Sequence, residues 1–226
     1  MYSILLSKIE GLELLRDRYL NILNENSKVV ILPWAFATEL NSDKLLNEYF
    51  KKNGERYNKY IKQLKSFGVN ESNIQICDCY GQSNRELVKV IENSDVILLP
   101  GGNPEMLMSK ILHKTELFYT LKRYKGIIIG ESAGALLQLE RYFITAKNNF
   151  YKYLAFYDGI GVLSNPFLID VHSDDTEEYI EELQNIAQKT AKDIYAIYDN
   201  GAILYNRVDR KVECFGKTRY IKKMKI

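Results

Sequence analysis

Short runs of apolar, often β-branched residues recur along the chain, separated by longer segments in which apolar positions follow a helical period. The five clearest runs cover residues 2–6, 28–32, 73–77, 95–99 and 126–129. Continuous apolar runs of this length are typical of strands buried on both faces of a parallel sheet. We therefore expect an α/β fold in three layers, flavodoxin-like, with a mostly parallel central sheet flanked by helices.

The segments between and after these runs carry helix and turn signals. Helices are expected over residues 54–67, 104–113, 135–141 and 174–192, the last with an acidic start and a basic end that suit the helix dipole. Asn103 and Pro104 form a typical helix start. Four short strands are expected at 194–198, 202–205, 211–215 and 219–221, with a turn at Asp199-Asn200-Gly201 joining the first two. They predict a small antiparallel C-terminal extension.

Composition narrows the class of protein. Hydrophobic residues make up 46% and charged residues 27% of the 226 positions, which fits one globular domain over residues 1–226. The 31 basic and 29 acidic residues nearly cancel, so neither nucleic acid nor a membrane surface is indicated as a partner. Three cysteines and two histidines form no metal-binding spacing.

Localisation and partners follow from the same counts. No run approaches the roughly 20 apolar residues that a bilayer requires, and the cysteines suggest reduced thiols, so we expect a cytoplasmic protein. We expect no metal and no cofactor. A small molecule is the expected partner, and the chain can be a monomer or a homodimer.

The most specific motif is Gly130-Glu131-Ser132-Ala133-Gly134, which matches G-x-S-x-G and lies between an expected strand and an expected helix. In such an elbow the serine stands clear of the sheet in a strained backbone conformation, and the N–H of Ala133 faces a developing oxyanion. The pattern also fits a tight turn whose serine caps the helix. We interpret Ser132 as a nucleophile.

A second loop, Gly101-Gly102-Asn103, follows the fourth expected strand. Ligands bind at the carboxyl ends of the strands in open α/β sheets, so this loop is expected to abut the Ser132 elbow. Its backbone N–H groups would then be available to an oxyanion or a substrate, and Asn103 would also cap the next helix.

A seryl nucleophile requires a base, and the chain has only His113 and His172. His113 ends an expected helix, whereas His172 ends an apolar run and so lies at the same sheet edge as Ser132. We expect Ser132 and His172 to lie within about 2.6 to 3.2 Å of each other.

Three features occur together: the elbow, the Gly-Gly-Asn loop, and a later histidine preceded by the run Gly159-Ile-Gly-Val-Leu163. In this combination the chain resembles the dipeptidase E and cyanophycinase family of serine peptidases, relatives of class I glutamine amidotransferases. The resemblance spans most of the chain. It implies a serine-type peptidase acting on small peptides, with Ser132 as nucleophile and His172 as general base. It also implies the amides of Gly102 and Ala133 as oxyanion donors.

The third catalytic residue is open. The resemblance places an acid roughly 15 to 18 residues after the serine, where the chain has Lys147-Asn148-Asn149. Glu140 is the first candidate; Asp158, or an asparagine at 148 or 149 that fixes the imidazole tautomer, are the others. Because this acid is uncertain, two further functions remain: a non-catalytic binding or sensing relative, and an acyl transferase or esterase using the same residues.

Overall fold

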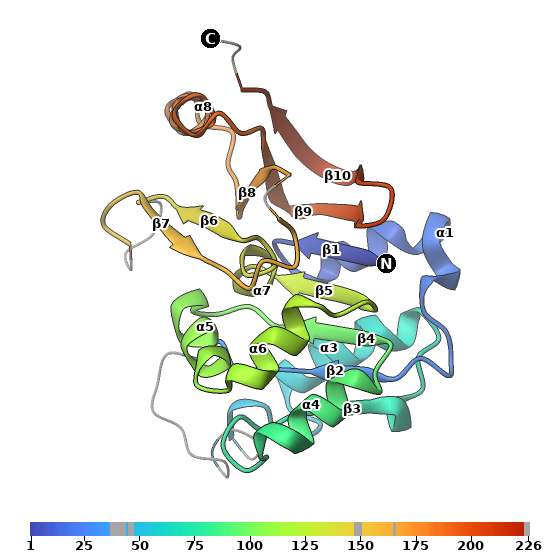
Figure 1. Cartoon of the computed structure of the whole chain (residues 1–226). Coiled ribbons are helices and arrows are strands. Elements are labelled where there is room, and N and C mark those ends of the chain that lie inside the picture. Colours follow the sequence, from blue (N-terminus) through green and yellow to red (C-terminus); the bar gives the residue numbers. More distant parts are fainter. Residues whose placement is uncertain (37–43, 45–47, 147–150, 165, 224–226) are drawn as a thin grey trace.

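The structure, a computed structural model, describes residues 1–36, 44, 48–146, 151–164 and 166–223 (Figure 1). Its main sheet has eight strands in the order β10-β9-β1-β5-β4-β2-β3, with β8 paired to β9. The strands are β1 (Tyr2–Leu6), β2 (Val29–Ile31), β3 (Ile74–Ile76), β4 (Val96–Leu99), β5 (Ile127–Glu131), β8 (Leu168–Val171), β9 (Ile194–Asn206) and β10 (Lys211–Ile221).

The five strands expected from the apolar runs, β1 to β5, pair in parallel with one another. β8 is parallel to β9, while β9 is antiparallel to both β1 and β10. The fold is therefore a single α/β domain with a mostly parallel sheet, as expected. Parallel order brings the carboxyl ends of β1, β4 and β5 to one edge.

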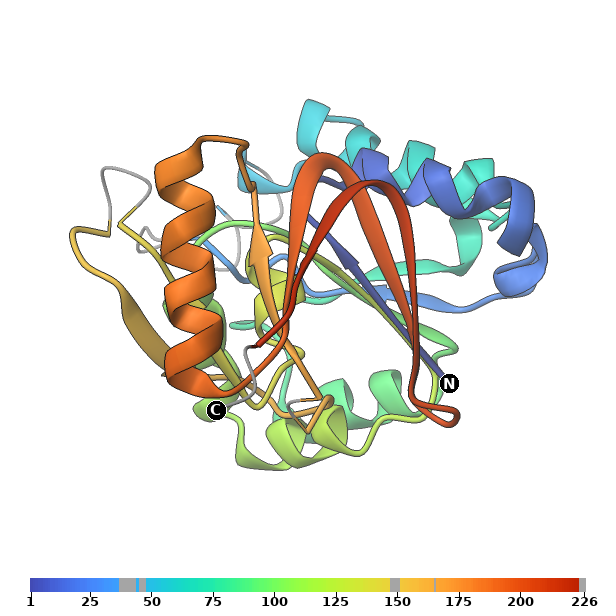
Figure 2. The ribbon, with the colours of Figure 1, turned by 90° about the horizontal axis from the view of Figure 1, so that it is seen from above.

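Helices cover both faces of the sheet (Figures 1 and 2). One face packs against α4 (Asn84–Glu92), α5 (Pro104–Leu112) and α6 (Thr115–Lys122), and the other against α3 (Glu55–Ser66) and the 3-10 helix η1 (Ile9–Leu15). Successive residues of one strand point to opposite faces, so Leu5 belongs to the first core while Ile4 and Leu6 belong to the second. Because both faces of β1 are buried, its sequence does not alternate between apolar and polar residues.

The remaining helical elements are four short ones, α1 (Arg16–Tyr19), η2 (Leu20–Ile22), η4 (Glu71–Asn73) and α7 (Ala133–Leu136), and the longer α8 (Glu177–Thr190). The helix expected over 135–141 is shorter and begins earlier, as α7. It ends at Leu136 because the backbone groups of residues 137–140 form hydrogen bonds with the backbone of residues 159–163 instead of continuing the helix. β6 (Arg141–Ile144) then pairs with β7 (Ala155–Asp158) in a separate antiparallel hairpin that the apolar pattern did not indicate. Within the described residues, no helix has the length and apolarity needed to cross a membrane.

The C-terminal region differs from expectation in one respect that affects the site. The prediction of a turn at Asp199-Asn200-Gly201 is wrong, because β9 is one continuous strand that includes these residues. Its first half pairs with β8 and its second half with β1, while β10 follows it throughout with a register shift between Gly216 and Thr218. Asp199 therefore lies inside a strand, where β9 passes from one partner to the next.

Candidate active site

Ser132 lies at the sharp turn between β5 and α7. Its backbone has φ 48° and ψ −108°, a conformation that residues other than glycine rarely adopt. Its N–H donates to the Leu6 carbonyl over 2.7 Å, and its carbonyl accepts the Ala135 N–H over 2.9 Å. The side chain makes no capping hydrogen bond to α7. The strained elbow expected from the motif is confirmed, and the hydroxyl is not engaged as a helix cap.

The two glycines of the motif are required by packing. A Cβ on Gly130 would lie 2.3 Å from the carbonyl oxygen of Gly134, and a Cβ on Gly134 would lie 2.0 Å from the carbonyl oxygen of Leu99. Real Cβ atoms do not approach backbone this closely. Only glycine therefore allows β5, α7 and the end of β4 to meet at the elbow.

His172 follows β8 and reaches the elbow from the neighbouring part of the sheet. Its Nε2 lies 3.0 Å from Ser132 Oγ, within the expected range. Its own backbone is left-handed, with φ 54°. Ser7, which is fully buried after β1, holds it there: Ser7 Oγ accepts the His172 N–H over 2.9 Å and donates to the Ile197 carbonyl over 2.7 Å.

Asp199 occupies the other side of the imidazole. Its Oδ1 lies 2.6 Å from His172 Nδ1, and its Oδ2 forms an ion pair of 2.6 Å with Lys8 Nζ. Partial burial raises the pKa of the Asp199 carboxyl, but the hydrogen bonds from Lys8 and His172 outweigh this, so its pKa lies below the ordinary value. An ionised carboxylate in this place fixes the tautomer that carries its proton on Nδ1. Nε2 is then free to accept a proton from Ser132.

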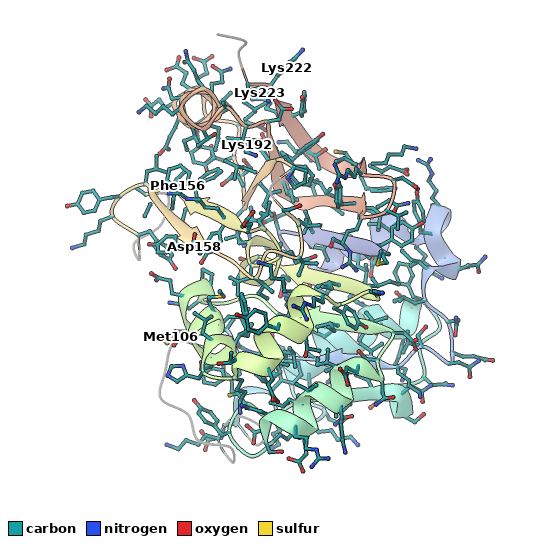
Figure 3. All side chains as sticks on the ribbon, viewed as in Figure 1. Met106, Phe156, Asp158, Lys192, Lys222 and Lys223 are labelled. Carbon is teal, nitrogen blue, oxygen red and sulfur yellow. The ribbon has the colours of Figure 1, made fainter. Side chains whose placement is uncertain are left out.

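The expectation that Glu140 holds the imidazole is not met in this geometry, because Asp199 takes the nitrogen that faces away from Ser132. Glu140 lies between α7 and β6, with its backbone bonded to Gly159 and Leu163. Asp158 ends β7 and lines a different cavity together with His113; Figure 3 shows it on the β6–β7 hairpin. Residues 147–150, which include the two asparagines considered for this role, lie outside the described residues.

Sequence reasoning missed Asp199 for two reasons. The resemblance places the acid soon after the serine, and the pattern Asp199-Asn200-Gly201 predicts a turn. One signal was present: Asp199 directly follows the apolar run at 194–198, 27 residues after His172. Whether that run ends beside β8 and β1 depends on strand order, which the run itself does not reveal.

The glycine loop abuts the elbow, as expected. A Cβ on Gly101 would lie 3.3 Å from the Cβ of Ser132. Gly102 has φ 142°, and a Cβ there would lie 2.2 Å from the carbonyl oxygen of Ala35, so glycine is required on both counts. Asn103 caps α5, because its Oδ1 accepts the Met106 N–H over 2.9 Å.

The amides of this loop are not equivalent. The Gly101 N–H donates to Glu131 Oε2 over 3.0 Å, and the Asn103 N–H donates to the Ala35 carbonyl over 2.6 Å. Among the described residues, no acceptor takes the N–H of Gly102 or of Ala133. Of the four residues expected to bind an oxyanion or a substrate, only Gly102 and Ala133 therefore offer a backbone donor near Ser132.

Two cavities meet at Ser132. The larger, about 1320 Å³, extends from Ser132 and His172 between η1 and α3. The smaller, about 110 Å³, lies behind the elbow and is lined by apolar side chains such as Leu136 and Phe143 as well as by Ser132 and Ala133. Within the described part of the chain, no cluster of three His, Cys, Asp or Glu side chains could hold a metal ion.

A serine, an imidazole and a carboxylate joined by hydrogen bonds, with the serine on a strained elbow of an α/β sheet, define the class of serine hydrolases. The family is shown independently of this geometry: the chain belongs to peptidase family S51, whose model matches residues 4–212. The protein is thus a peptide-bond hydrolase, a serine peptidase of the peptidase E type, and its substrates are peptides.

Solved structures share the fold. A proposed peptidase E from Listeria monocytogenes EGD-e has a TM-score of 0.66 and 20% identity, covering 96% of this chain and 98% of that one. A peptidase from an acI-B1 Actinobacterium has a TM-score of 0.56 and 13% identity, covering 99% of this chain and 95% of that one. A sequence comparison with curated proteins found no match.

Proposed function

We propose that the protein hydrolyses small peptides by covalent catalysis, with Ser132 as nucleophile, His172 as general base and Asp199 as the acid that orients it. One observation carries the proposal. Ser132 Oγ, His172 Nε2, His172 Nδ1 and Asp199 Oδ1 form a hydrogen-bonded series with separations of 3.0 Å and 2.6 Å, and it starts at a strained elbow. Strain retained at such a site favours a catalytic role over a structural one.

The reaction follows from these positions. Ser132 Oγ attacks the carbonyl carbon of the scissile peptide bond while His172 Nε2 takes the hydroxyl proton. The imidazolium, stabilised by Asp199, then gives that proton to the departing amine as the C–N bond breaks. Water, activated by the same nitrogen, attacks the acyl-enzyme ester and releases the carboxylic acid and the free serine.

The negative charge of the tetrahedral intermediate requires donors in place before the attack. The N–H groups of Gly102 and Ala133 are suited to this role, because both adjoin Ser132 and lack an acceptor among the described residues. The N–H groups of Gly101 and Asn103 are engaged within the protein, so their part is to hold the loop.

A non-catalytic binding function is the alternative if no acid accompanies the imidazole. Asp199 provides a carboxylate at the imidazole, which removes the reason for that alternative. The exposed fractions of the His172 and Asp199 side chains, 44% and 48%, favour hydrolysis over acyl transfer, since water can reach the acyl-enzyme. The cavity of about 1320 Å³ exceeds the roughly 300 to 1,000 Å³ of typical small-molecule sites and can hold a peptide.

Labelling with a fluorophosphonate, which reacts only with an activated serine, tests the proposal. The wild type should label and should cleave members of a panel of two- to five-residue peptides, and Ser132→Ala should do neither. His172→Asn should lose both activities as well. His113→Asn is the matched control: this histidine bonds the Ser109 carbonyl at the end of α5, so its loss should change neither rate. Absence of labelling in a folded wild type would refute the proposed function.

A further inference from the structure

Glu131, which directly precedes Ser132 in the G-x-S-x-G elbow, is a buried carboxylate with only 5% of its surface exposed. Its Oε1 accepts hydrogen bonds from Lys59 Nζ over 2.6 Å and from the Ile9 N–H over 3.1 Å. Its Oε2 accepts the Gly101 N–H over 3.0 Å and a short hydrogen bond from the Tyr60 hydroxyl. The four donors come from η1, α3 and the glycine loop, so one side chain ties three elements to the end of β5.

These bonds fix the peptide units on either side of Gly102. Glu131 takes the N–H of Gly101, and the carbonyl of Ala35 takes the N–H of Asn103 over 2.6 Å. Of the three consecutive amides, the middle one alone has no acceptor among the described residues. With its neighbours held, the Gly102 N–H keeps one direction, and a Cβ on Gly101 would already touch the Cβ of Ser132 at 3.3 Å.

The charge of Glu131 needs compensation. A carboxylate close to the glycine loop would repel the oxyanion that forms on the substrate, and this repulsion is strong where water is excluded. Burial raises the pKa of the Glu131 carboxyl, but the hydrogen bonds from Lys59 and Tyr60 lower it further, so the group stays ionised. The Lys59 ammonium supplies the opposite charge at 2.6 Å.

We infer that Glu131 and Lys59 are a positioning pair for the oxyanion site: Glu131 holds the glycine loop so that the Gly102 N–H faces the substrate carbonyl, and Lys59 neutralises the carboxylate. This inference rests on the proposed function. It assigns both residues an effect on the transition state, which neither reaches directly, and no role in binding the ground-state peptide.

A matched pair on the same helix provides the control. Lys65 of α3 forms an ion pair of 3.3 Å with Glu71, which also accepts the hydroxyl of Tyr57 over 2.9 Å. Both glutamates thus receive a lysine and a tyrosine from α3, but Glu71 has no contact with the glycine loop among the described residues. Lys65→Met and Glu71→Gln reproduce the chemical changes away from the site.

The experiment measures kcat, KM and the rate of fluorophosphonate labelling at a temperature where circular dichroism shows every variant folded. Glu131→Gln places an amide NH2 against existing donors, and Lys59→Met leaves the buried charge uncompensated. Each should lower kcat and the labelling rate about 10- to 100-fold with KM nearly unchanged, below the 10²- to 10³-fold effect of losing an oxyanion donor outright. Lys59→Arg should recover most of the rate, and the two control variants should match the wild type.

The inference would be overturned, while the proposed function stands, by wild-type rates in Lys59→Met and Glu131→Gln or by equal losses in the Lys65 and Glu71 variants. A rise in KM with kcat unchanged would also overturn it, because it would mean that the pair binds substrate. Failure of the proposed function would appear differently, as a wild type that neither labels nor cleaves peptides.

Discussion

Replacing Asp199 with asparagine tests the orientation of the base, and the structure indicates how the amide would settle. Asp199 lies between two donors, His172 Nδ1 at 2.6 Å and Lys8 Nζ at 2.6 Å. An asparagine has one oxygen and one NH2, so it can satisfy only one of them. Lys8 is always a donor, whereas the neutral imidazole can switch its proton to the other nitrogen. The asparagine oxygen should therefore turn to Lys8 and its NH2 to Nδ1.

That arrangement moves the imidazole proton to Nε2, where it blocks transfer from Ser132. The same substitution in a buried serine-protease triad costs about 10⁴ in kcat. Here the Asp199 side chain is 48% exposed, so water can replace part of its electrostatic effect, although water does not restore the tautomer. We expect a loss of about 10³- to 10⁴-fold, or about 4 to 5 kcal/mol at 1.36 kcal/mol per tenfold change.

The assay is kcat on a cleaved peptide together with the fluorophosphonate labelling rate. In Asp199→Asn combined with Lys8→Met, the amide is free to present its oxygen to Nδ1, so the double variant should be faster than Asp199→Asn alone. Glu140→Gln is the control and should match the wild type. A loss below tenfold in Asp199→Asn, or an equally large loss in Glu140→Gln, would refute the assignment of Asp199 as the orienting acid.

Three further predictions concern the supports of the site. Gly102→Ala should lower the free energy of unfolding by about 1 to 3 kcal/mol and abolish peptide cleavage, because its Cβ would meet the Ala35 carbonyl oxygen at 2.2 Å in a conformation that L residues avoid. Urea unfolding measures the stability, and wild-type stability in this variant would contradict the prediction. Ser7→Ala removes the acceptor that holds the left-handed backbone of His172, so we expect about 1 to 3 kcal/mol less stability and a lower kcat; an unchanged kcat would exclude this role. The pKa of Glu131 is lower in the folded protein than its ordinary 4.5, so its charge stabilises the fold above about pH 4.5 and this contribution is lost as the pH falls further. The free energy of unfolding of Glu131→Gln should therefore fall less steeply with decreasing pH than that of the wild type. Equal slopes would contradict the prediction.

The core of the sheet and half of the site could be read from local sequence. Apolar runs predict β1, β2, β4 and β5 because strands covered on both faces consist almost entirely of apolar residues. The edge strand β3 was recognised from a weaker run in which Gln75 is exposed. The elbow at Ser132 could be located because close packing requires both of its glycines: Gly130 lies against Gly134, and Gly134 lies against Leu99 at the end of β4. His172 could be chosen because it ends an apolar run, whereas His113 ends an expected helix.

The remaining residues of the site were decided by the tertiary structure. Asp199 reaches His172 because it lies where β9 passes from its parallel pairing with β8 to its antiparallel pairing with β1. The order of these strands in the sheet is not recorded in any local pattern. Glu131 and Lys59 meet across 72 positions of sequence, where α3 packs over the end of β5. Side-chain periodicity reports which face of an element is buried, but the identity of the neighbour depends on how strands and helices are ordered in space. For this protein the sequence alone determined the type of fold and the serine and histidine that we propose as nucleophile and base, and the tertiary structure determined which charged groups surround them.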